Sequence, residues 1–101
     1  MQSMPPEGSR WPPSVVVPDI HLPHLYRDVV LPMWVLYDHP DDLPHYFALR
    51  LWDAMTNTAT PFVFIAAELK DIEAQIDAIP GRFFRLSRHE NDDAKILATY
   101  L

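Results

Sequence analysis

Five side chains that could bind a metal ion or transfer protons fall within eight positions of the sequence. Asp38, His39, Asp41, Asp42 and His45 lie between two apolar runs. Imidazole and carboxylate groups are competent ligands for zinc or iron, and they also act as general acids and bases. One interpretation is therefore a metal-dependent or acid–base enzyme that uses His39, Asp42 and His45.

The spacing within this cluster favours a different interpretation. The two histidines do not follow the His-x-x-x-His pattern that puts two imidazoles on one helical face. Pro40 and Pro44 restrict φ within the segment, and aspartate side chains hydrogen-bond the backbone of turns. We therefore favour a rigid turn between two strands, with no metal, no cofactor and no catalytic residue.

The composition argues against several other classes of function. The chain has 101 residues, a net charge of −6 and no cysteine. Phosphate binding needs a basic face, so we expect no nucleic-acid ligand. Without cysteine there is no disulfide and no thiolate chemistry. No apolar run approaches the roughly 20 residues that span a bilayer, and the N-terminus does not resemble a secretory signal, so we expect a soluble, cytoplasmic protein without membrane partners.

Hydrophobic patterns predict a single α+β domain over residues 33–101, in the order β-β-β-α-β-β. Strand composition covers residues 33–37, 46–54 and 61–66, and again 82–87 and 95–101. Between the third and fourth strands, Leu69, Ile72, Ile76 and Ile79 recur at the spacing of one helical face. We expect an antiparallel sheet of about five strands with this helix on one face.

Residues 1–32 differ from the rest of the chain in composition. They hold seven of the eleven prolines and show no sustained hydrophobic periodicity. Proline restricts φ and removes a backbone donor, so we expect a mostly extended N-terminal arm. Trp11, the apolar residues 15–17 and Leu25 could anchor this arm on the domain or on a neighbouring subunit.

A single helix can cover only one face of the predicted sheet. If Leu49 faces the helix, strand alternation places neighbouring large side chains on the opposite face. These are Tyr46, Arg50 and Trp52, which are residue types common at interface hot spots. With Trp11, they form the predicted interaction surface of a non-enzymatic module that binds a protein partner or forms a homodimer. The alternative, in which the arm covers this face and completes a monomer, stays open.

One local segment of the acidic chain is basic. Arg82, Arg85 and Arg88 are spaced three apart, and on a strand Arg85 points away from the side of the other two. Three acidic residues follow at positions 90–93. We favour charge neutralisation between these two stretches, with a site for an anion or an acidic partner as the alternative.

The segment from Trp34 to Phe47 resembles a motif of small uncharacterised proteobacterial proteins. That motif reads W-x-[VIL]-Y-x-x-P-x-D-x-P-x-x-[FY], and an R-x-x-x-D-D stretch follows it near the C-terminus. The matching positions here are Trp34, Leu36, Tyr37, Pro40, Asp42, Pro44, Phe47, Arg88, Asp92 and Asp93. The resemblance covers residues 33–101 and implies a self-contained bacterial domain, but it implies no activity.

Overall fold

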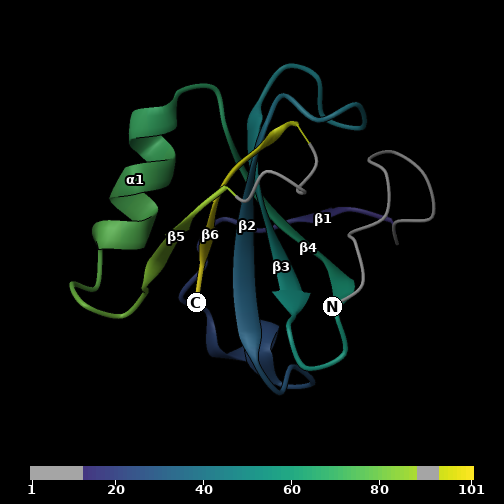
Figure 1. Ribbon diagram of the computed structural model, residues 1–101, viewed down its shortest axis with the longest axis vertical. Helices are drawn as coiled ribbons and strands as arrows, with labels where there is room; N and C mark the ends of the chain where they lie inside the picture. The colour runs from purple at the N-terminus through teal and green to yellow at the C-terminus, as the bar shows by residue number, and fades with distance from the viewer. Residues whose placement is uncertain (1–12, 89–93) are drawn as a thin grey trace.

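The protein has an α+β fold in which one α-helix packs against a six-stranded mixed sheet (Figure 1). The computed structural model describes residues 13–88 and 94–101. Within them lie, in chain order, β1 (Val15–Val16), the 3-10 helix η1 (Pro23–Tyr26), β2 (Pro32–Asp38), β3 (Phe47–Asp53), β4 (Thr58–Ala66), α1 (Leu69–Asp77), β5 (Arg85–Ser87) and β6 (Ile96–Tyr100). The α+β class with one helix is confirmed, and β5 is shorter than we expected.

The strands lie in the order β1-β4-β3-β2-β6-β5. Every neighbouring pair from β4 to β5 is antiparallel, whereas β1 runs parallel to β4. We expected about five strands, all antiparallel. The sheet instead has six strands, and one of its pairs is parallel. The reason is that Val15 and Val16 of the arm pair with Phe62 and Val63 along the outer edge of β4.

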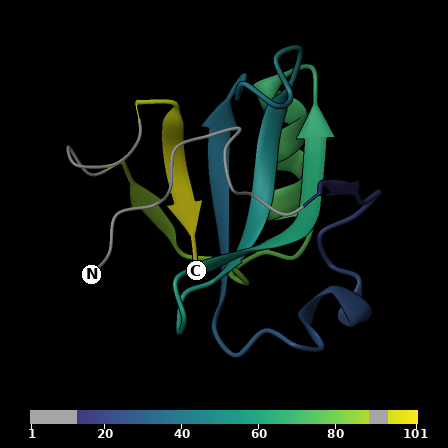
Figure 2. The same cartoon turned by 90° about the vertical axis from the view of Figure 1, so that its right-hand side faces the viewer.

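Helix α1 follows from the spacing of its apolar residues. Ile72 and Ile76 are buried against the sheet, and Asp71 lies in the first turn, where the helix dipole favours negative charge. The helix ends at Asp77. Ile79, which we expected on the buried face, is exposed because it follows the last helical residue. Figure 2 shows α1 behind the sheet, so it covers one face only.

The face covered by α1 holds the larger of two apolar clusters. Its buried members are Val17, Ile20, Leu25, Trp34, Leu36, Leu49, Leu51, Ile72, Ile76, Ala98 and Tyr100. Leu49 therefore faces the helix, as strand alternation predicted. Val17, Ile20 and Leu25 belong to the arm, so this part of the arm packs on the same face as α1.

Hydrogen bonds fix the arm to α1 and β2. The backbone N–H of Ile20 donates to Oε1 of Gln75 at 3.1 Å, and Nε2 of His21 lies 2.7 Å from the Gln75 carbonyl oxygen. The indole N–H of Trp34 donates to the Tyr26 hydroxyl at 2.9 Å, and that hydroxyl donates to the carbonyl of Ile20. Burial raises the pKa of Tyr26, and the Trp34 hydrogen bond partly opposes this effect. The described part of the arm is thus packed onto the domain.

The opposite face of the sheet carries a second apolar cluster. Its buried members are Met33, Val35, Tyr37, Ala48, Trp52, Val63 and Ile96. Leu43, from the loop between β2 and β3, is partly buried against them. The β2–β3 loop therefore packs against the face that α1 leaves uncovered.

Candidate functional site

The acidic and imidazole side chains near the β2–β3 loop bind separate partners. Nδ1 of His39 lies 2.5 Å from Oδ1 of Asp38. Oδ1 of Asp41 lies 2.6 Å from Nζ of Lys95. Asp42 instead binds an arginine of β3. The carboxylates therefore pair with different groups and do not converge on one point.

The three residues of the enzyme alternative are not brought together. His45 is exposed, and residues 13–88 and 94–101 contain no group of three or more His, Cys, Asp or Glu side chains that could hold a metal ion. His39 and Asp42 are engaged in the pairs just described. The loop itself contains a reverse turn, in which the N–H of Leu43 donates to the carbonyl of Pro40 at 2.9 Å.

Trp52 and Arg50 do not form the exposed surface that we expected from the sequence. Strand alternation places both on the face opposite α1, but their exposed fractions are only 0% and 1%. Trp52 packs in the second apolar cluster beside Met33, its neighbour across the strands. Tyr46 is 37% exposed, and Trp11 lies outside the described residues. The chain itself buries Trp52 and Arg50, so the exposure that we expected for these two side chains is wrong.

Arg50 is held by side chains from two other segments. Its Nη2 donates to Oγ of Ser14 at 2.8 Å and to Oδ2 of Asp42 at 3.0 Å. Burial lowers the pKa of Arg50, and the negative charge of Asp42 opposes this effect. The guanidinium thus joins the arm, the β2–β3 loop and β3.

The second sheet face becomes exposed toward β5 and the C-terminal end of β6. Leu86 pairs with Thr99, and Thr99 pairs with Val35, so these side chains form one row across the sheet. Along this row, the exposed fraction rises from 0% for Val35 to 40% for Leu86. In the next row, Phe84 is 68% exposed and Leu101 is 41% exposed. We call Phe84, Leu86 and Leu101 the open sheet face.

Strand β5 is also an edge of the sheet in the part of the chain that the structure describes. Phe84 and Leu101 exchange two backbone hydrogen bonds, of 2.8 and 2.9 Å. In an antiparallel ladder, the backbone groups of successive residues point alternately to the two sides of a strand. The N–H and C=O groups of Arg85 and Ser87 therefore point away from β6. An edge with outward N–H and C=O groups can accept another strand.

Sequence reasoning missed the open sheet face, although part of its signal is present. Phe84 and Leu86 alternate with Phe83 and Arg85, which predicts a strand with side chains on two faces. Phe83 is partly buried in the α1-side cluster, whereas Phe84 is exposed. The position of this strand at the edge depends on tertiary packing, and no local pattern reveals it.

No protein-family model, curated protein or solved structure matches the chain. The resemblance of the segment from Trp34 to Phe47 to small proteobacterial proteins therefore stays a prediction. Among the described residues, no helix combines the length and the apolar character needed to cross a lipid bilayer.

Proposed function

We propose that the protein is a small, non-enzymatic interaction module that binds a second copy of itself through strand β5. The proposal rests on one observation, which is that a strand edge left unpaired by residues 13–88 and 94–101 lies beside exposed apolar side chains. Such an edge is a template for pairing with another chain, and apolar contacts next to it add favourable burial. Phe84, Leu86 and Leu101 supply this apolar area.

A two-fold axis at Leu86 makes β5 complementary to itself. In an antiparallel pair centred there, Arg85 lies opposite Ser87 of the second copy, and Ser87 lies opposite its Arg85. These are the two residues whose backbone groups point outward, so each pair would exchange two hydrogen bonds. Leu86 would face Leu86 as a non-hydrogen-bonded pair, in which side chains approach most closely.

The charges near β5 are compatible with this register. Arg85 faces a serine, so like charges are not directly opposite each other. Glu73 and Asp77 line a hollow of about 300 Å³ together with Arg85, which places negative charge near the guanidinium. The net charge of −6 opposes association of two copies. We therefore expect a weak dimer that becomes tighter when added salt screens this repulsion.

Sedimentation velocity over a range of protein concentrations tests the proposal. We expect the weight-average sedimentation coefficient to rise between about 5 μM and 500 μM, the range in which weak protein pairs form. Leu86→Asp should keep the protein monomeric, because two carboxylates would then meet at the two-fold axis.

Val30→Asp is the matched control for this experiment. Val30 is also an exposed apolar residue, but it lies outside β5 and β6, so this variant should associate like the wild type. Wild-type protein that stays monomeric at every concentration would contradict the proposal. Equal loss of association in both variants would contradict it too.

A further inference from the structure

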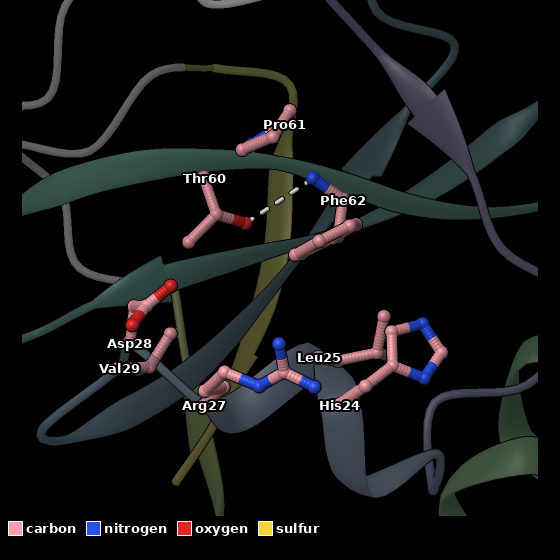
Figure 3. A pocket seen from close by; sticks show the side chains of 8 residues that line it. All are labelled: His24, Leu25, Arg27, Asp28, Val29, Thr60, Pro61 and Phe62. Atoms are coloured by element: carbon pink, nitrogen blue, oxygen red, sulfur yellow. Dashed lines mark hydrogen bonds between the residues drawn. The ribbon is translucent and has the colours of Figure 1, made fainter.

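A cavity of about 430 Å³ lies between η1, with the residues that follow it, and strand β4 (Figure 3). Strands β3, β2 and β6 separate β4 from β5, so the cavity is distinct from the open sheet face. Its volume falls in the range of pockets that bind small molecules, roughly 300–1,000 Å³. Ligand binding in this cavity is therefore a separate proposal from self-association through β5.

One side of the cavity is apolar and fixed in position. Leu25 is buried in the α1-side cluster, and Val29 and Phe62 are partly buried against it. The hydroxyl of Thr60 accepts the backbone N–H of Phe62 at 3.2 Å and donates to the carbonyl of Leu51 at 2.8 Å. These contacts hold the Phe62 segment in place, so the apolar wall exists before any ligand binds.

The other side of the cavity carries two charged side chains, those of Arg27 and Asp28. Figure 3 shows the guanidinium of Arg27 extending toward Leu25 and the space beside Phe62, with the carboxylate of Asp28 at the other end. Neither charged side chain has a hydrogen bond or an ion pair within the described residues. The ring of His24 meets Phe62 edge to face, with centroids 6.4 Å apart.

We propose that this cavity binds a monocarboxylate that has an aromatic or aliphatic body. The planar guanidinium of Arg27 binds the carboxylate through two parallel N–H···O hydrogen bonds. The body of the ligand displaces water from Val29 and Phe62, the partly buried apolar residues of the wall. Asp28 repels a second carboxylate at the far end of the ligand, so a dicarboxylate binds more weakly than a monocarboxylate.

A free aromatic acid and the C-terminal phenylalanine of a peptide share this chemistry. 3-Phenylpropionate is the probe for the first source, and acetyl-Gly-Gly-Phe is the probe for the second. Tighter binding of the free acid identifies a small metabolite-like acid as the ligand class. Tighter binding of the peptide identifies a chain terminus. Either result supports a carboxylate site at Arg27.

Chemical-shift titration of the ¹⁵N-labelled full chain measures this binding. The amide signals of Arg27, Val29 and Phe62 should move, with a dissociation constant on the order of 1 mM for a one-ring acid. 3-Phenylpropanamide has the same shape without the charge. It should bind about fivefold more weakly, because it lacks the charge-assisted pair with Arg27.

Two variants and one control complete the test. Arg27→Gln should abolish the preference for the acid over the amide, and Arg85→Gln, on β5, should leave that preference intact. Asp28→Asn should strengthen binding of the dicarboxylate 3-(4-carboxyphenyl)propionate. Equal binding of acid and amide by the wild type would overturn the proposal, as would shifts confined to other parts of the chain. A preference that survives Arg27→Gln would also overturn it.

Discussion

Phe84 and Leu101 exchange two backbone hydrogen bonds, of 2.8 and 2.9 Å, where β5 meets the C-terminal end of β6. This exchange determines which side of β5 each backbone group faces, so Arg85 and Ser87 present theirs at the open edge. It also places Phe84 and Leu101 on one face, and Leu86 follows on that face two residues later. The pairing register of β5 with β6 therefore produces both the open backbone edge and the exposed apolar face on which the proposed self-association depends.

Asp42→Ala should destabilise the protein far more than Asp41→Ala. Asp42 lies 3.0 Å from the guanidinium of Arg50, whose side chain is 1% exposed, so the substitution removes a negative charge from beside a buried positive one. We expect a loss of about 2 to 3 kcal/mol in the free energy of unfolding. Asp41 pairs with Lys95 at the surface, and its loss should cost less than about 1 kcal/mol. Urea unfolding followed by circular dichroism measures both values, and equal losses would contradict the structural role of Arg50.

Asp53→Asn should remove part of the stability that the protein has at neutral pH. The Asp53 carboxylate accepts backbone N–H bonds from Val30, Leu31 and Met55, at 3.0 to 3.1 Å. The Val30 hydrogen bond, joined by those of Leu31 and Met55, lowers the pKa of Asp53. Because the folded pKa is depressed, this stability is present above the ordinary aspartate pKa and is lost as the pH falls through the folded value.

The measurement for Asp53 is the melting temperature as a function of pH. Wild-type protein should melt at a higher temperature than Asp53→Asn at pH 7, and the difference should shrink below about pH 4. Asp28→Asn is the control, because Asp28 is exposed and makes no hydrogen bond or ion pair with the described residues. A difference between wild type and Asp53→Asn that stays constant down to pH 2 would contradict this account.

Tyr26→Phe should weaken the attachment of the arm to the sheet. The Tyr26 hydroxyl accepts the indole N–H of buried Trp34 and donates to the carbonyl of Ile20. Its removal leaves a buried donor unsatisfied, which costs about 1 to 3 kcal/mol. Tyr46→Phe, at an exposed tyrosine, should change the free energy of unfolding by less than about 0.5 kcal/mol. Urea unfolding of the two variants makes the comparison, and equal effects would show that the arm is not fixed through Tyr26.

Local patterns were sufficient to locate the helix and the central strands. Ile72 and Ile76 recur at helical spacing, and the buried face of α1 is the face they define. Leu49 and Trp52 fall on opposite sides of β3, as strand alternation predicted. These features depend on neighbours a few residues apart, so the sequence specifies them directly.

The remaining features depend on contacts between distant segments. Arg50 is buried although arginine is usually found at the surface, and it binds Ser14, which lies 36 positions earlier. Val17 and Ile20 enter the core from a proline-rich arm without periodicity. The placement of β5 at the sheet edge likewise requires β6 to pair with β2, which no pattern within residues 82–101 indicates.

The most direct test of self-association through β5 uses single cysteines, since the natural chain has none. In the proposed register, Leu86 faces its own copy with Cα atoms about 4.5 Å apart, within the range that a disulfide spans. Phe84 is more exposed, but it lies opposite Arg88, so the two copies of residue 84 are about 13 Å apart along the strands. Under mild oxidation, Leu86→Cys should form a disulfide-linked dimer on a non-reducing gel, and Phe84→Cys should remain monomeric. Cross-linking of Phe84→Cys at the same rate as Leu86→Cys, or of neither variant, would contradict the proposed pairing.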